Sequence, residues 1–543
     1  MPTTLLGATP IPPQTHPSRP AVAPAVARTV LVSAAVLGAT ADALMHDGPG
    51  GLGFTVWIAL LLLNAVLLFT RADRTLSRET LAWLSAAVAF SFGLAWRNSE
   101  ALLGFDFLAV LFSLGMAAIS ARDPRAALFA SRMRHTVFTA FDVAVNIAIG
   151  ILPLALREAV LNETGKKAVG RGRRLVRPAL IAVVALVIFG SLLRNADPLF
   201  ASLVSIPTFD FETVGSHFLV AGFFGWIVAG WARASLAENA PQHRSATPAP
   251  IQLGAADITA ALGALGVLFA AFVATQIGWM FGGEKLLQAR TGLTAATYAR
   301  QGFFQMVWVV TLVVPILVGS RVALGPGRAL ARRHTLLSLP VVVLLGAIIV
   351  SAMLRMKMYV HYYGLTTERL YPAVFMLWLA TVLVWLALTV LRDRGRPFIG
   401  GAVISGMTFL LALNVADPDA VVARVNVWRA ERSVSSDQAL DLVHLASLRG
   451  AGTPMAVDAV LRADVSTSVA TTPNSVAAHR CLAARTLLGR WNSRTAAYRR
   501  MTGAGGWRYW NHDDAIAFEA VGARRAELQR FANEGCAPAQ PEH

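Results

Sequence analysis

The sequence has few cysteines and few charged side chains for its length. Only two of its 543 residues are cysteine, Cys481 and Cys536, and they lie far apart in the chain. A zinc site or a dithiol redox site needs cysteines or histidines at short, regular spacing, and that spacing is missing. Charged residues make up 15% of the chain, whereas soluble domains average about 25%. We therefore expect neither a metal centre nor a cofactor, and we do not expect an ordinary soluble protein.

Familiar catalytic motifs are also missing. The sequence contains no HExxH, no Walker A loop and no GxSxG, and the glycine-rich run Leu324–Gly327 is not placed between a strand and a helix. We predict no catalytic residue. The net charge of +17 does not indicate nucleic acid as a partner, because the basic residues fall mainly in short loops between apolar runs, where they set membrane topology.

Long apolar runs are what the sequence does contain. Runs of this length recur along most of the chain, which is typical of membrane-spanning helices. The predicted fold is an all-α, polytopic transmembrane helical bundle with a C-terminal soluble helical domain, and the lipid bilayer is its first partner. The predicted spans lie at about 29–44, 52–69, 81–96, 101–120, 178–193, 216–232, 255–280, 302–319, 336–354, 373–391 and 398–415.

The positions of arginine and lysine predict the topology. A twelfth apolar run, 136–156, contains Asp142 and Asn146 and ends near Pro153. If this run crossed the membrane, the most basic loop of the chain, 157–177, would lie outside, against the positive-inside rule. We therefore predict eleven spans plus one interfacial or re-entrant helix in the cell (inner or plasma) membrane, with the N-terminus in the cytoplasm and the C-terminus outside.

This topology divides the chain into five parts. They are a disordered tail (1–28), N-terminal transmembrane helices (29–135), an interfacial helix with a basic cytoplasmic loop (136–177), a transmembrane core (178–415) and an extracytoplasmic helical domain (416–543). In an oxidising compartment Cys481 and Cys536 could form a disulfide, and two unrelated buried thiols are the alternative.

Asp42, Asp106 and Asp257 lie within or at the ends of predicted spans. Asp106 and Asp257 could form a proton or cation relay, because charged groups inside a bilayer are costly and usually functional. No two carboxylates share a span at relay spacing, however. We therefore favour a structural interpretation, in which each carboxylate reaches the interface or pairs with an arginine.

The segment Arg355–Tyr371 is the best candidate for an outer-face site. It is basic and aromatic, it lies between two apolar runs, and helical spacing puts Arg355 and Tyr359 on one face. Such a face could hold an anionic lipid headgroup. Alternatively, its cations pair with acidic groups nearby. The complete candidate set is Arg355, Lys357, Tyr359, His361, Arg369, Tyr371, Glu284, Tyr298, Arg300 and Asp197.

Five segments together resemble a known family. They are Leu192–Phe200, Ile277–Glu284, Gly292–Phe304, Arg355–Tyr371 and Leu413–Asn426. In combination they resemble uncharacterised bacterial integral-membrane proteins of the domain of unknown function 4173, with its relative 4153, over roughly residues 180–460. The resemblance implies an integral membrane protein and supplies no catalytic residue.

Three functions remain open after the sequence has been read. The first is a non-enzymatic envelope protein whose outer domain binds a partner, such as another envelope protein, or senses a signal. The second is a transporter of a small or lipid-like anion. The third is a membrane enzyme that acts on lipid-linked substrates at the outer face. The large C-terminal region favours the first, and the absence of a paired acid and base counts against the third.

Overall fold

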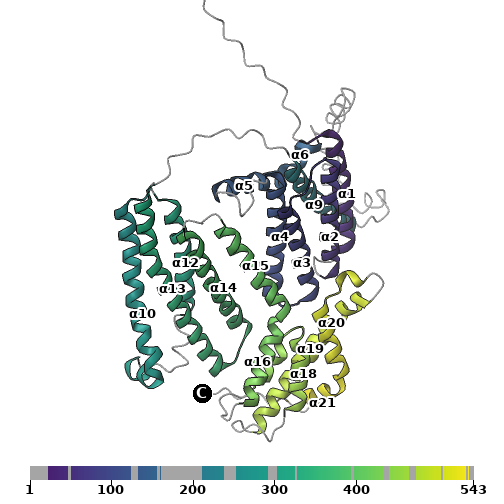
Figure 1. The fold of residues 1–543 in the computed structure, drawn as a ribbon. Coiled ribbons are helices and arrows are strands. Elements are labelled where there is room, and N and C mark those ends of the chain that lie inside the picture. The colour runs from purple at the N-terminus through teal and green to yellow at the C-terminus, as the bar shows by residue number, and fades with distance from the viewer. Residues whose placement is uncertain are drawn as a thin grey trace, which may run out of the picture. The chain divides into compact units, whose positions relative to one another are not determined.

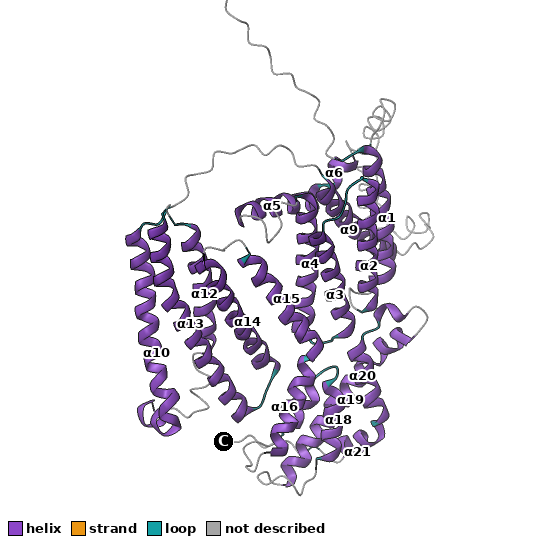
Figure 2. Cartoon of the chain, in the orientation of Figure 1, coloured by secondary structure: helices purple, strands orange, loops and turns teal. Residues whose placement is uncertain are grey.

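A computed structural model of the chain consists of helices (Figure 1, Figure 2). It describes residues 22–46, 51–123, 133–155, 159, 211–237, 252–291, 303–324, 327–392, 397–432, 440–463, 473–502, 506–533 and 536. The one β element among these residues is an isolated parallel bridge between Leu253 and Leu324. The predicted all-α fold is confirmed.

Ten of the described helices are long and apolar enough to cross a bilayer. They are α1 (Pro24–Met45), α2 (Leu52–Arg71), α3 (Arg78–Trp96), α4 (Glu100–Arg122), α9 (Phe211–Leu236), α10 (Ala255–Thr291), α12 (Phe303–Val322), α13 (Arg328–Tyr363), α14 (Thr367–Thr389) and α15 (Phe398–Ala416). They coincide with ten of the eleven predicted spans, and the eleventh, 178–193, lies outside the described residues. The protein is a multi-pass membrane protein.

Two predicted boundaries need comment. Helix α1 begins at Pro24, within the predicted disordered tail, because proline is well suited to the first position of a helix, where its missing N–H is not needed. The run 136–156 forms α5 (Met133–Ile149) and the short α6 (Ile151–Pro153), with a turn at Gly150. Its apolar part, Thr139–Ile149, is shorter than the ten membrane-length helices. Its interfacial position remains a prediction.

The chain folds as two compact units. The first holds residues 1–40, 63–76 and 141–242. In it, Gly38 of α1 lies directly against the backbone of Ala221 in α9, where a side chain would clash. Such close contacts between small residues are a common way to pack helices in lipid, because apolar side chains gain little there by leaving the bilayer. Arg74 also donates to the Leu236 carbonyl oxygen at 3.0 Å, at the end of α9.

The second unit holds residues 41–62, 77–140 and 243–543. Helices α10, α12, α13 and α14 share one apolar core, with Val310, Leu317, Leu345, Met376 and Leu386 fully buried. Pro315 and Pro340 lie inside α12 and α13 without ending them. Membrane helices tolerate internal proline because neighbouring groups satisfy the freed carbonyls. Helix α15 packs on α14 and on α4 and leads into the C-terminal region.

The C-terminal region of this second unit is a helical domain with its own core. Its helices are α16 (Pro418–Arg432), α17 (Leu442–Ser447), α18 (Gly452–Arg462), α19 (Pro473–Thr502), α20 (His512–Ala523) and α21 (Arg525–Asn533), with a 3-10 turn, Gly506–Tyr509. Buried alanine, leucine and valine side chains from α16 to α21 form one cluster. In the structure a disulfide joins Cys481 of α19 to Cys536.

The C-terminal domain lies against one end of the membrane helices of its unit (Figure 1). It contacts the start of α2, where Leu52 N–H donates to the Trp510 carbonyl oxygen at 3.0 Å. It also contacts the α3–α4 loop through Asn98 and the α13–α14 loop through Leu365, whose side chain belongs to the domain's own core. The predicted topology assigns all three connections to one side of the membrane, and the structure gathers them at one face.

The disulfide generates a stability prediction. Exchanging both cysteines for serine (C481S/C536S) should destabilise the C-terminal domain by about 4 kcal/mol, because the bond closes a loop over 55 residues and limits the unfolded chain. Thermal unfolding of the full-length protein in detergent, with and without reductant, measures the loss. The wild type with reductant should match the double variant, and equal melting temperatures with and without reductant would contradict the prediction.

Candidate functional site

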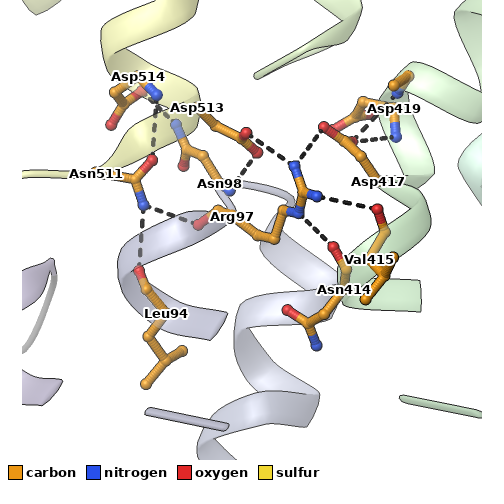
Figure 3. Close-up of polar contacts among 11 residues, drawn as sticks. Leu94, Arg97, Asn98, Asn414, Val415, Asp417, Asp419, Asn511, Asp513 and Asp514 are labelled. Carbon is orange, nitrogen blue, oxygen red and sulfur yellow. Dashed lines mark hydrogen bonds and ion pairs between the residues drawn. The ribbon is translucent and has the colours of Figure 1, made fainter. Parts of the chain in front are cut away.

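The side chain of Arg97 lies at the centre of the contact between membrane helices and C-terminal domain (Figure 3). It follows the last residue of α3, and its side chain is 9% exposed. One of its terminal nitrogens, Nη1, contacts Asp417 Oδ2 at 3.0 Å and Asp513 Oδ1 at 3.2 Å. Nε donates to the Asn414 carbonyl oxygen at 2.6 Å, and Nη2 donates to the Val415 carbonyl oxygen at 3.3 Å. A single guanidinium thus joins α3, the end of α15 and α20.

The end of α3 explains why these groups converge. The last carbonyls of a helix have no partner within the helix and must find donors elsewhere. Asn511 supplies one, because its Nδ2 donates to the Leu94 carbonyl oxygen at 3.1 Å and to the Arg97 carbonyl oxygen at 2.9 Å. The Oδ1 atom of Asn511 accepts from Asp514 N–H at 3.1 Å and so caps α20. One asparagine therefore ends α3 and begins α20.

Asp417 has the same double role on the other side of Arg97. Its Oδ1 accepts the backbone N–H groups of Asp419 at 3.0 Å and Ala420 at 3.2 Å, which begins α16, while its Oδ2 pairs with Arg97. Its φ of 58° lies in the left-handed region, which aspartate adopts more readily than most residues. This sharp turn joins α15 to α16 and directs the carboxylate at Arg97. Asp513 Oδ2 in turn accepts the Asn98 N–H at 3.2 Å.

We call the contact formed by Arg97, Asp417, Asn511 and Asp513 the junction. Acidic groups outnumber Arg97 there, and this shifts their pKa values. Burial and, to a smaller extent, the nearby Asp417 carboxylate raise the pKa of Asp513 to about 7, against the opposing effect of Arg97. Burial and Asp417 likewise raise the pKa of Asp419 to about 6, against Arg449 and Arg490. The junction therefore has two carboxyl groups that titrate between mildly acidic and neutral pH.

A further buried acid lies among the membrane helices, close to this junction. Asp106, in the second turn of α4, is fully buried, and its Oδ1 accepts from Asn414 Nδ2 at 2.7 Å. The favoured interpretation expected Asp106 to reach the interface or to pair with an arginine. Among the described contacts Asp106 does neither. Asp257 does fit that interpretation, because it is exposed at the start of α10 and accepts the Gly254 N–H at 2.9 Å.

The predicted outer-face residues are distributed over separate contacts. Helix α13 continues to Tyr363, as their shared face requires. Arg355, however, is buried, and its Nη2 donates to Gln276 Oε1 of α10 at 2.5 Å. Lys357 and His361 are exposed. The side chain of Glu284, together with Tyr298, Arg300 and Asp197, lies outside the described residues.

Arg369 serves mainly the end of α13. Its guanidinium lies 4.1 Å from the centre of the Tyr359 ring, and its Nη1 donates to the carbonyl oxygens of Tyr363, at 3.0 Å, and Gly364. From the C-terminal domain, Asn426 bonds to both the N–H and the carbonyl oxygen of Leu365, each at 2.7 Å. The α13–α14 loop is thus a docking point for that domain.

Tyr371 links this loop to the Arg97 region. Its hydroxyl hydrogen-bonds Ser99 Oγ at 2.8 Å, and its ring lies 6.1 Å from that of Phe105. Of the six predicted residues whose side chains the structure describes, Tyr371 is the one that lies beside the junction. Sequence reasoning missed Arg97, Asp417, Asn511 and Asp513. A signal was present for two of them, because Arg97 and Asp417 each directly follow an apolar run.

Removing the Arg97 guanidinium tests the junction. Arg97→Ala should lower the stability of the folded protein by about 3–5 kcal/mol, because it leaves two buried carboxylates without their cation. Arg462→Ala is the matched control, since Arg462 lies in the same domain and pairs with Asp458, and both side chains are exposed. That pair is worth about 1 kcal/mol or less. Thermal unfolding in detergent compares the variants, and equal losses would contradict a central role for Arg97.

The raised pKa of Asp513 predicts how stability depends on pH. The folded protein holds this proton more tightly than the unfolded chain, where the pKa is near 3.8. Stability from this group is therefore fully present below about pH 4 and is lost as the pH rises through about 7. Asp513→Asn should flatten the fall in melting temperature between pH 4 and 8, whereas Asp458→Asn, at an exposed pair, should not. Parallel curves for wild type and Asp513→Asn would refute this assignment.

Comparison with known proteins identifies the family. No curated protein and no solved structure matches the chain. A family model does match residues 80–459, from the start of α3 to α18, and it is described as a domain of unknown function, DUF4153. DUF4153 is the family that the sequence analysis named as a relative of domain of unknown function 4173. The resemblance to 4173 itself is not confirmed. The matched region contains Arg97, Asn414 and Asp417, and it exceeds half of the chain, so the protein belongs to the DUF4153 family.

Proposed function

We propose that this protein is a non-enzymatic envelope protein whose C-terminal domain binds a protein partner at the outer face of the cell membrane and transmits the bound state to the membrane helices. The observation that carries this proposal is Arg97, which is bonded to both the first and the last parts of the C-terminal domain, at Asp417 and Asp513. Any movement of that domain must act on α3.

The charge distribution supports an outer position for the domain. At the helix ends opposite the domain, within its unit, lie arginines at the end of α12, the start of α13 and the end of α14: Arg321, Arg328, Arg332, Arg333 and Arg392. At the near end, Arg97, Arg355 and Arg369 are occupied by internal contacts. An excess of loop arginine is typical of the cytoplasmic side. The disulfide agrees with an oxidising compartment.

The exposed surface of the domain supports a protein partner. Trp428 of α16 is 54% exposed and has the Arg432 guanidinium 4.4 Å from its ring centre. Leu482 of α19 is 47% exposed. Tryptophan and arginine are enriched in the parts of interfaces that contribute most to binding. The alternatives are an anion transporter and an enzyme acting on lipid-linked substrates, and both would need basic side chains that reach a ligand. Within Arg355–Tyr371, Lys357 and His361 are exposed, whereas Arg355 and Arg369 bond to groups of the protein.

Photocrosslinking in intact cells tests partner binding. A photoreactive amino acid at Trp428 or Leu482 should yield an adduct of one discrete mass. The same amino acid at Val384, exposed in the middle of α14, is the control and should not yield that adduct. Identical patterns at all three positions would refute partner binding by the domain.

The coupling step has its own test. Hydrogen exchange of α3 amides should slow when the crosslinked partner is present in the wild type. In Arg97→Ala the adduct should still form while the change in α3 becomes smaller, because the exposed surface is kept and the Arg97 side-chain contacts are lost, although Asn511 still bonds to the α3 carbonyls. An equal change in both proteins would refute transmission through Arg97.

A further inference from the structure

The buried pair Asp106 and Asn414 has more acceptor oxygens than donors. Asn414 Nδ2 donates to Asp106 Oδ1 at 2.7 Å and to the Leu410 carbonyl oxygen at 3.1 Å. The remaining oxygens, Asp106 Oδ2 and Asn414 Oδ1, are both buried, and no donor among the described residues reaches either one. Rotating the amide does not solve this, because its oxygen would then face the Leu410 carbonyl.

Both of these oxygens converge on Gly93 of α3. A methyl group at Gly93 would lie 2.7 Å from each of them, so they approach the same point on the glycine backbone. Little space remains there for a metal ion with its five or six ligands, since the glycine itself occupies it. A proton needs no such space. An ionised carboxylate with one buried oxygen that no donor reaches is also strongly unfavourable among membrane helices.

We propose that Asp106 is a proton-binding site inside the membrane bundle, with the proton carried on Oδ2 and Asn414 as its partner. A neutral carboxylic acid supplies the donor that this group of oxygens lacks. The bound proton is the ligand, and the proposal is independent of whether the C-terminal domain binds a protein.

The site is connected directly to the junction. Asn414 holds Asp106 with its side chain and accepts Arg97 Nε with its carbonyl oxygen. The described titratable or charged groups around this end of α4 include Glu100 with Arg449, Tyr371 of α14, Asp417 after α15, and Asp513 and Asp514 of α20. Ionised Asp106 would add a further negative charge beside Asn414, which binds Arg97 through its carbonyl oxygen. The proton on Asp106 keeps that charge away from the contact between Arg97 and the C-terminal domain.

Infrared difference spectroscopy tests the proton directly. The spectrum of full-length wild type minus that of Asp106→Asn at pH 7 should contain the carbonyl band of a protonated carboxylic acid, which shifts on transfer to deuterium oxide. Carboxylate bands alone would overturn the proposal. Replacement of sodium by choline should leave the band unchanged, and a dependence on sodium would assign the site to a cation instead.

A second measurement does not depend on the folding of Asp106→Asn. In the Asp419→Asn/Asp513→Asn variant, the two carboxyl groups of the C-terminal domain with a raised pKa are removed. With isotope-labelled aspartate, this variant should retain an aspartic acid band at pH 7, and its absence would refute the proposal.

The link to the junction is tested by melting temperature. Above pH 7 the wild type should lose stability relative to Asp106→Asn, because only the wild type can develop the buried charge. If the melting temperatures of wild type and Asp106→Asn changed with pH in parallel, loss of the proton from Asp106 would have no effect on stability, and the proposal would be overturned.

Discussion

The arrangement of the second unit depends on one buried guanidinium. Arg97 is taken out of water, and its desolvation is tolerable only while Asp417, Asp513 and two backbone carbonyls surround it. These partners come from two distant parts of the chain, residues 414–417 at the end of α15 and Asp513 of α20, and Asp417 also begins α16. Separating the C-terminal domain from α3 would leave charges and helix ends unpaired together, so the contact is expected to be all-or-none.

At this face of the protein, several polar side chains bond to backbone carbonyl oxygens near the ends of membrane helices. Asn511, Asn426 and Arg369 each bond to backbone carbonyls at the end of a membrane helix. The last carbonyls of a helix have no partner within the helix, so the two asparagines that bind these carbonyls help to hold the C-terminal domain against the membrane helices. The same need explains the polar composition of the segment Arg355–Tyr371. Much of its polarity is directed inward, at helix ends and at the docked domain, and Lys357 and His361 are left exposed.

The junction and the intramembrane acid form one chemical system. Asn414 touches both Asp106 and Arg97, and the carboxyl groups around Arg97 exceed it in number. Where several acids share one cation in a place of low polarity, protons are retained more easily than in water. A partner at the C-terminal domain and a proton in the membrane would then act on the same residue. Experiments can therefore test whether Asp106 and the C-terminal domain both act on Arg97.

The membrane class, the ten described spans and the helical character of the C-terminal region can be read from the amino-acid sequence, because apolar length and helical periodicity are local properties of the chain. The sequence also marks Arg355–Tyr371 as unusual and has a glycine, Gly364, where α13 ends with a φ of 76°. Which polar residues meet became evident only from the packed fold. Arg97 and Asp513 are separated by more than four hundred residues, and an arginine after an apolar run looks the same whether it faces water or a buried acid. Partner choice for a charge depends on burial, and burial arises only when distant segments pack together.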